Sequence, residues 1–258
     1  KNTRLVVINH ASNVCGTLQD VAAIKAVVGD IPLLLDAAQT AGVYPIDVKA
    51  LGIDFLAFTG HKGLMGPQGT GGLYVREGIK IRPFKRGGTG SKSEEMRQPD
   101  FMPDLLEAGT QNNVGIAGLG AAVAFILDEG IAKIRLHEQT LTKVLLDGIY
   151  DLQNVAIYGP LDPGRQTATI SITIDSTLSE NSRGNLGCGA INLEWFNDSV
   201  PISEAEDRLG SQFNILVRVG LHCSPMAHQT IGTFPSGTIR LSMGYFNTIE
   251  DIKAAVKA

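Results

Sequence analysis

A lysine follows an apolar run of the chain in the segment Thr59-Gly60-His61-Lys62. A lysine amine held in such a loop can react with an aldehyde to form an imine, the usual route of covalent catalysis by lysine. Thr59 and His61 are residue types that could hold an anionic group beside it. A solvated lysine is the alternative, because residues 66–72 that follow are rich in glycine. The segment alone leaves both interpretations open.

An acidic residue, Asp36, ends a second apolar run and is followed three positions later by Gln39. A carboxylate at the end of a buried strand is desolvated unless a cation or hydrogen-bond donors compensate it. A cationic ligand would supply that compensation. Asp36 could instead cap a following helix, since aspartate is among the preferred N-cap residues.

A thiol and an imidazole stand side by side in His222-Cys223, and arginines lie nearby at Arg218 and Arg240. In an electropositive loop a thiol gains thiolate character and becomes a better nucleophile. A lone cysteine can equally be a small buried hydrophobic residue. The pattern therefore indicates either a nucleophile or a core residue.

Two other kinds of site fail on spacing. Residues 86–93 end in Lys-Ser but have Ser91 where the Walker pattern needs glycine, and Gly69-Thr70-Gly71 has Tyr74 where a dinucleotide motif needs its third glycine. A zinc site would need paired ligand spacing, which the candidate ligands lack. Those candidates are Cys188, His222, Cys223 and His228. We therefore expect no nucleotide loop and no metal.

The elements that position these residues form an α/β pattern in the first part of the chain. Strands are expected at residues 5–8, 32–35, 55–58 and 71–75, and a helix at 18–28. This alternation predicts a largely parallel sheet, in which ligands collect beyond the carboxyl ends of the strands. Asn13, Asp36 and Lys62 each lie close to such an end, so we expect them to meet there.

A long loop and a helical bridge follow this sheet. Residues 80–103 are polar and rich in basic residues and glycine, which is typical of a functional loop. The pattern from 114 to about 152 is helical and is broken near Gly130. We expect this segment to lead from a first domain, residues 1–150, into a second one, residues 151–258.

The second domain is predicted to be a smaller α+β unit. Its expected strands are residues 155–158, 168–174, 191–196, 216–219 and 238–243. Its expected helices are residues 203–212 and a terminal helix from about residue 249. Residues 176–189 are rich in serine, asparagine and glycine, which predicts a loop.

The composition limits the kinds of binding partner and the cellular compartment that are expected for this protein. The chain has 258 residues, 43% of them hydrophobic, with 22 Lys and Arg against 26 Asp and Glu. A net charge of −4 gives no reason to expect a nucleic-acid or anionic-membrane surface. The longest apolar stretch, 114–127, is too short to cross a bilayer. Three widely spaced cysteines fit a reducing compartment, so the cytoplasm is expected.

Taken in order, six motifs resemble those of the class V aminotransferase group of pyridoxal phosphate (PLP) enzymes, and most closely its cysteine desulfurase and selenocysteine lyase branch. The motifs are Asn9-His10-Ala11-Ser12-Asn13-Val14, Asp36-Ala37-Ala38-Gln39, Thr59-Gly60-His61-Lys62, Glu107-Ala108-Gly109-Thr110, Arg218-Val219-Gly220-Leu221-His222-Cys223, and Arg240 through Tyr245-Phe246-Asn247-Thr248. The resemblance covers almost the whole chain. It implies fold type I of PLP enzymes, with a large α/β domain, incomplete at its amino end here, and a smaller carboxy-terminal α+β domain.

The resemblance also implies a cofactor site for PLP. Lys62 would bind the cofactor as an imine and later move protons at the α-carbon of the substrate. Asp36 would pair with the protonated pyridine nitrogen, which makes the ring an electron sink, and Gln39 would donate to the ring hydroxyl. Thr59 and His61 are similar to phosphate ligands of the family.

Further positions imply a substrate site and a dimer. Arg240 resembles the arginine that binds the substrate carboxylate, and Asn13 matches an assisting position. Arg218 is expected in the same substrate site. Cys223 resembles the nucleophile that takes sulfur from cysteine as a persulfide. Thr110 matches a position that reaches the phosphate of a neighbouring subunit, which implies a homodimer.

The expected activity is thus that of a PLP-dependent cysteine desulfurase, which converts cysteine, or selenocysteine, to alanine and passes the sulfur or selenium to an acceptor protein. Two alternatives remain. Another lyase, an aminotransferase or an epimerase of the same group would leave His222-Cys223 incidental. A non-catalytic chain would need a partner that supplies an amino-terminal part.

The chain departs from the family pattern in two places. Family chains begin more than a hundred residues earlier, with further phosphate ligands and a ring stacked on the cofactor, so these residues are expected to have no counterpart here. Residues 175–214, which include Cys188 and the only tryptophan, Trp195, are longer and differently composed than the family's usual segment. This segment precedes the Cys223 loop, where it could alter access of the substrate or docking of an acceptor.

Overall fold

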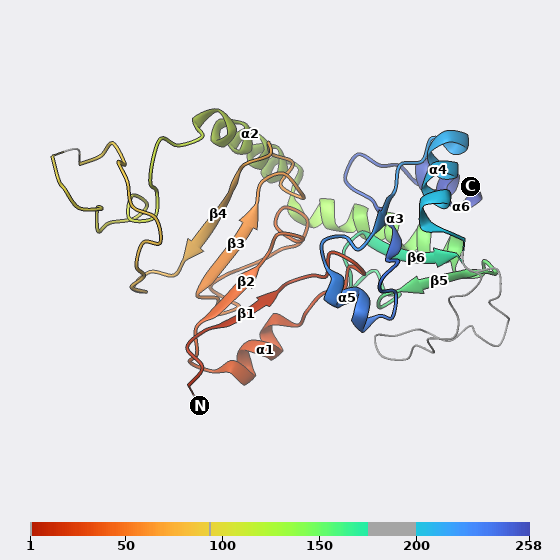
Figure 1. Ribbon diagram of the computed structural model, residues 1–258, viewed down its shortest axis with the longest axis horizontal. Helices are drawn as coiled ribbons and strands as arrows, with labels where there is room; N and C mark the ends of the chain where they lie inside the picture. The colour runs from red at the N-terminus through yellow and green to blue at the C-terminus, as the bar shows by residue number, and fades with distance from the viewer. Residues whose placement is uncertain (1, 93, 175–199) are drawn as a thin grey trace.

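The computed structural model describes residues 2–92, 94–174 and 200–258, and these residues form two sheets joined by two long helices (Figure 1). The expected strand at 191–196, Cys188 and Trp195 lie outside the described residues.

The first sheet consists of four strands in the order β1 (Val6–Asn9), β2 (Leu33–Asp36), β3 (Phe55–Thr59) and β4 (Gly71–Val75). The first three strands run parallel, and β4 is antiparallel to β3. The prediction of a largely parallel sheet is confirmed. Its one antiparallel pair is formed because the loop that carries Lys62 turns the chain straight back along β3.

Helix α1 (Val21–Val28) connects β1 to β2 and begins three residues later than expected. The Asp20 side chain accepts a hydrogen bond from the Ala23 amide at 2.9 Å and thereby caps the helix. Leu18 is instead paired with Ala11 in an isolated bridge. The cap at Asp20 and the bridge to Ala11 therefore outweigh the apolar spacing at residue 18.

The core of the first sheet lies between α1 and the strands. Val21, Leu33, Leu35 and Ile53 are buried there. At its edge the carboxylate of Asp54 accepts hydrogen bonds from the Leu33 amide and from Arg76, each at 2.8 Å. Burial alone would raise the pKa of Asp54, but these bonds and the charge of Lys25 lower it.

Two helices, α2 (Asn113–Glu129) and α3 (Ile131–Ile149), follow the long loop and meet at an angle of 80°. Gly130 between them has a φ of +84°, which a glycine adopts without steric cost, so the expected break is confirmed. No single helix of the described residues is long and apolar enough to cross a membrane. The bent pair of α2 and α3 reaches that length and apolar composition only when the two helices are counted together. The buried residues Leu141 and Leu145 of α3 belong to the core of the second sheet.

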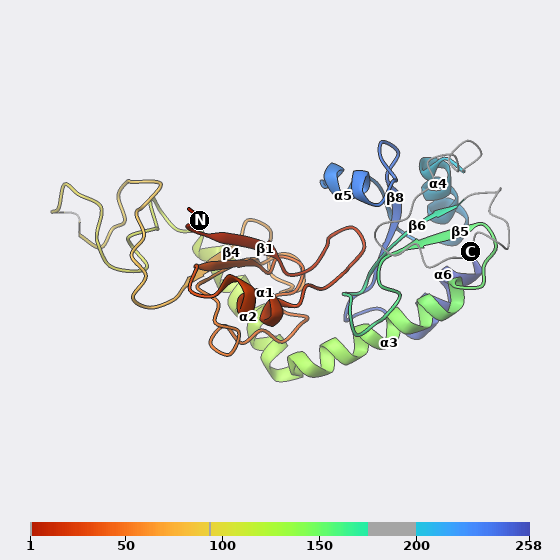
Figure 2. The ribbon, with the colours of Figure 1, turned by 90° about the horizontal axis from the view of Figure 1, so that it is seen from below.

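The second sheet is antiparallel and has the order β5 (Val155–Tyr158), β6 (Thr169–Ile174), β8 (Thr238–Ser242) and β7 (Arg218–Gly220). Helices α3, α4 (Ile202–Phe213) and α6 (Ile249–Lys257) surround its core. Figure 2 shows α3 running along this half of the molecule. The fully buried side chains of the core of the second sheet include Leu141, Leu145, Ile170 and Ile239.

A short helix, α5 (Pro225–Thr230), was not expected from the sequence. Ser224 followed by Pro225 is a common way to begin a helix, because proline suits the first helical turn. Six residues are too few to show a helical repeat of apolar positions. The start signal was present, but the periodicity that would have supported it was not.

The loop after β1, residues 10–20, reaches from the first sheet to the second (Figure 2). Thr17 forms a bridge with Gln166, and the Leu18 amide donates to the Arg165 carbonyl at 2.9 Å. Val14 is fully buried in a cluster with Tyr158 and Ile231. This loop therefore packs as part of the second half of the molecule.

Candidate active site

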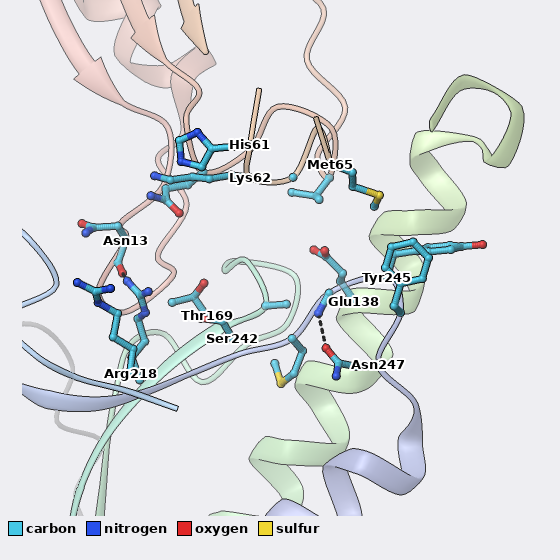
Figure 3. Close-up of a pocket in the computed structure, with 18 of the residues that line it drawn as sticks. Asn13, His61, Lys62, Met65, Glu138, Thr169, Arg218, Ser242, Tyr245 and Asn247 are labelled. Carbon is cyan, nitrogen blue, oxygen red and sulfur yellow. Dashed lines mark hydrogen bonds between the residues drawn. The ribbon is translucent and has the colours of Figure 1, made fainter. Parts of the chain in front are cut away.

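A pocket of about 670 Å³ lies where the two halves meet (Figure 3). It is lined from the first half by Asn13, Gln39, His61 and Lys62, and from the second half by Arg218, His222, Cys223 and Arg240. Seven of the ten residues selected from the sequence are in this set, which adds His222. The pocket combines an amine, a thiol and two guanidinium groups.

Lys62 lies in the loop between β3 and β4, three residues beyond the end of β3. The loop is held by hydrogen bonds from the Gly60 amide to the Thr70 carbonyl at 2.8 Å and from the Met65 amide to the Lys62 carbonyl at 2.8 Å. The Lys62 side chain is exposed, and its ammonium group has no hydrogen-bond or ion-pair partner among the described residues. The amine is thus presented to the pocket and is free to react.

Thr59 and His61 lie next to Lys62 and are hydrogen-bonded to each other, with 3.0 Å between Thr59 Oγ1 and His61 Nδ1. Thr59 is the last residue of β3 and is half-buried, while His61 is exposed. A hydroxyl and a ring nitrogen at the same strand end can both donate to an anionic group. The pair is suited to hold a phosphate beside the lysine.

Asp36 is the last residue of β2, one strand away from the Lys62 loop. Its Oδ1 accepts a hydrogen bond from the Ala38 amide at 2.9 Å, and the following residues form turns, so Asp36 caps no α-helix. The side chain is exposed, and the expectation that it is desolvated is wrong, because the carboxyl end of β2 is open to solvent. Its carboxylate can accept further hydrogen bonds from a cationic ligand.

Arg218 and Arg240 face each other across the pair of strands β7 and β8. Nη1 of Arg240 donates to the Asn13 carbonyl at 2.9 Å, whereas its Nε is buried without a hydrogen-bond partner. Burial and the neighbouring charge of Arg218 lower the pKa of Arg240. Neither arginine forms an ion pair with a described residue. Two close guanidinium groups without an acid between them form a site for a carboxylate.

Cys223 occupies the turn that follows β7, and its side chain is exposed at the pocket. The interpretation as a buried hydrophobic residue is therefore wrong. His222 before it is buried, and its Nε2 is 3.0 Å from Thr238 Oγ1. Burial and the charge of Arg240 lower the pKa of His222 to about 4, so its ring is neutral at pH 7.

Two of the expected cofactor residues and Thr110 do not line this pocket. Asp36 and Thr59 lie at the strand ends beside it, as described above. Thr110 is exposed in the segment before α2, where the Gly109 amide donates to the Gly88 carbonyl of the long loop. Its hydroxyl therefore does not enter the site of its own chain.

Glu138 is a pocket residue that the sequence reasoning missed. It projects from α3 into the pocket (Figure 3) and is only 4% exposed. Burial raises the pKa of its carboxyl group to about 7, and the charge of Arg135 opposes this rise. Charged residues three positions apart on the buried face of a helix, among apolar positions, are a signal that could have identified it.

Comparisons with known proteins agree with this geometry. The model of the family described as Aminotransferase class-V matches residues 1–255. A probable cysteine desulfurase of Methanothermobacter thermautotrophicus is 33% identical over 98% of the chain, and a cysteine desulfurase of Yersinia pseudotuberculosis is 31% identical over 98%. The chain spans 59% and 57% of the length of these two relatives.

Solved structures of cysteine desulfurases also match the fold of this chain. The apo structure of a cysteine desulfurase from Thermococcus onnurineus matches with a TM-score of 0.78 and 28% identity, over 98% of this chain and 58% of that one. The cysteine desulfurase CsdA of Escherichia coli matches with a TM-score of 0.77 and 25% identity, over 98% of this chain and 57% of that one. The arrangement of the two halves is thus shared with solved proteins.

Proposed function

The chain belongs to the class V aminotransferase family, and from this premise we propose that it acts as a PLP-dependent cysteine desulfurase. One observation carries the proposal: a single pocket brings together a free lysine amine, two arginines without an acidic partner and an exposed thiol. These groups come from segments as far apart in the sequence as Lys62 and Arg240. The names of the relatives support the same activity.

The donor set around Lys62 fits PLP. A primary amine suits the aldehyde, the exposed carboxylate of Asp36 suits a protonated ring nitrogen, and the amide of Gln39 suits the ring hydroxyl. Thr59 and His61 would donate to the phosphate. Bound PLP would supply an electron sink for the α-carbon of an amino acid.

Four pocket residues of this chain then have defined tasks. Arg240 and Arg218 bind the carboxylate of cysteine, for which the buried and unpartnered Nε of Arg240 offers a donor. Lys62 accepts the proton from the α-carbon once its amine is released. The Cys223 thiolate attacks the sulfur of the substrate, so that an S–S bond forms as the C–S bond breaks, and alanine is the product.

We propose further that the chain works as a homodimer. Thr110 is exposed and lies outside its own pocket, which suits a residue that contacts the phosphate site of a second subunit. Helix α2, which begins three residues later, exposes the side chains of Val114, Ile116 and Leu127. Burial of such apolar surface favours association. Light scattering of the purified chain with and without PLP tests this proposal.

The first experiment is to add PLP to the purified chain, record the visible absorbance spectrum, reduce with borohydride and map the labelled lysine. We expect the label on Lys62 and no label at this peptide in Lys62→Ala. Alanine and sulfide are then measured after addition of cysteine, and transfer of the amino group to a keto acid is measured in parallel. Amino transfer without sulfide would contradict the desulfurase, and label spread over surface lysines would contradict the cofactor site.

A further inference from the structure

The side chain of Asn13 contacts both neighbours of Cys223. Its Nδ2 donates to the His222 carbonyl at 2.6 Å, and its Oδ1 accepts from the Ser224 hydroxyl at 2.8 Å. The carbonyl of His222 can only accept a hydrogen bond, so the orientation of the amide is decided by chemistry. The two ends of one amide thus enclose the turn that carries the thiol.

Ser224 makes the bond to Asn13 in place of a local one. It is the N-cap residue of α5, where a serine side chain ordinarily accepts a hydrogen bond from an amide of the first helical turn. Here the side chain makes no such bond. The Ser224 hydroxyl therefore stabilises the contact between the two halves of the molecule instead of its own helix.

The turn needs external support because its backbone is strained. His222 and Cys223 have φ values of +49° and +62°, in the left-handed region that residues with a Cβ seldom adopt. The turn has one internal hydrogen bond, from the Ser224 amide to the Leu221 carbonyl, and the His222 ring is anchored to Thr238. The bonds to Asn13 add support from a separate segment, the β1–α1 loop.

Asn13 also contacts the arginine of the carboxylate site. Its backbone carbonyl accepts from Arg240 Nη1 at 2.9 Å, while Asn13 itself is held in the β1–α1 loop that packs on the second half. One residue thus sets the position of the thiol turn relative to Arg240. Both ends of the Asn13 amide are used within the protein. Only the second lone pair of Oδ1 and the second hydrogen of Nδ2 remain for the substrate.

We propose that Asn13 is a positioning residue that holds the His222-Cys223-Ser224 turn, and with it the thiol, against the pocket. The proposal rests on the proposed function only for what the thiol does there. It differs from the role expected from the sequence, in which Asn13 assists in binding the substrate. The two roles predict different results for the same variant.

The test is hydrogen–deuterium exchange of the peptide 218–230 in the full chain, with and without PLP. In Asn13→Ala both bonds to the turn are lost, while the backbone bond to Arg240 can persist. Loss of two hydrogen bonds should speed exchange of the turn amides about tenfold or more. Asn9→Ala, which removes the same amide group at the end of β1, is the matched control and should leave this peptide unchanged.

Ser224→Ala approaches the contact from the other side and removes one of the two bonds. It should speed exchange by a smaller factor, and adding it to Asn13→Ala should give no further increase. Ser211→Ala, which removes a hydroxyl from α4, is its control. If Asn13→Ala does not fold, the comparison of Ser224→Ala with Ser211→Ala tests the proposal on its own. Equal exchange of the turn amides in these two variants would overturn it.

Kinetics separate positioning from substrate binding. A positioning role predicts that Asn13→Ala lowers kcat for sulfide release and changes KM for cysteine by less than about twofold. A raised KM with unchanged exchange of the turn would overturn the proposal in favour of substrate binding. Faster exchange in a chain whose wild type releases no sulfide would refute the desulfurase function and leave the positioning of the turn intact.

Discussion

Gly42 packs directly on the backbone of Gly63, so that the loop carrying Gln39 and the loop carrying Lys62 touch. A Cβ on Gly42 would overlap the carbonyl group of Gly63, and a Cβ on Gly63 would come within 2.7 Å of the Ala41 carbonyl oxygen. The approach of these two backbones fixes the loop of Gln39 against the loop of Lys62. Glycine is required on both sides.

Gly42→Ala should therefore lower both stability and cofactor binding. Gly42 has a φ of +91°, so alanine adds backbone strain as well as the overlap, and we expect a loss of about 3 kcal/mol in the free energy of unfolding. Gly78→Ala is a matched control, since its φ is +86° but nothing lies within 4 Å of the added Cβ. Urea denaturation of both variants tests this, and equal losses would show that the contact with Gly63 is unimportant.

Cys223→Ser should abolish sulfide release from cysteine and leave PLP bound to Lys62. A hydroxyl is far less ionised than a thiol at neutral pH and does not form a persulfide. Cys15→Ser is the control, because Cys15 is buried in the β1–α1 loop away from the pocket lining. Sulfide release is measured with each variant. Turnover that persists in Cys223→Ser would remove this thiol from the mechanism.

Arg240→Ala should weaken the use of cysteine by about 10- to 100-fold in kcat/KM, which corresponds to one or two lost hydrogen bonds to a charged group. Arg240→Lys should recover only part of this loss, because an ammonium group cannot form the paired bonds of a guanidinium group. Arg208→Ala on the exposed face of α4 is the control. The measurement is steady-state kinetics with cysteine. Equal kcat/KM values for the Arg240 and Arg208 variants would contradict the role of Arg240 in binding the carboxylate.

Glu138 should make the protein less stable as the pH rises from about 4.5 to about 7. Its pKa is raised to about 7 in the folded protein from an ordinary value of 4.5. The folded state therefore holds a proton that the unfolded state has already lost in this range. Its contribution to stability is complete below the lower value and is lost as the pH passes the higher one. The loss is about 3 kcal/mol.

The measurement compares the free energies of unfolding of the wild type and Glu138→Gln between pH 4 and 8. Burial lowers the pKa values of His10 and His222 to about 4, so these residues make the protein more stable as the pH rises. They are present in both proteins and do not affect the difference. The difference therefore isolates Glu138, and Glu138→Gln should gain relative stability with rising pH. Glu77→Gln, at an exposed turn, should show no such trend. A flat difference for Glu138→Gln would contradict its burial as a neutral acid.

Most elements could be predicted because their signals are local. The four strands of the first sheet are short apolar runs bounded by glycine or polar residues, and the break at Gly130 follows from a glycine within a helical repeat. The start of α1 and the existence of α5 were not predicted. The capping side chain of Asp20 decided the start of α1, and Pro225 in the first turn marked the start of α5. A single residue gives a weaker signal than a repeating pattern.

The sequence by itself determined which residue types stand at the ends of the strands, and hence an amine, an acid, a thiol and two guanidinium groups as candidates. Only the tertiary structure decided their neighbours. Asn13 and His222 are 209 positions apart, and their hydrogen bond exists because the β1–α1 loop packs on the second sheet. Likewise Glu138 enters the pocket because the chain turns at Gly130 between α2 and α3. Periodicity and caps act over a few residues, whereas contacts between distant segments depend on how the whole chain packs.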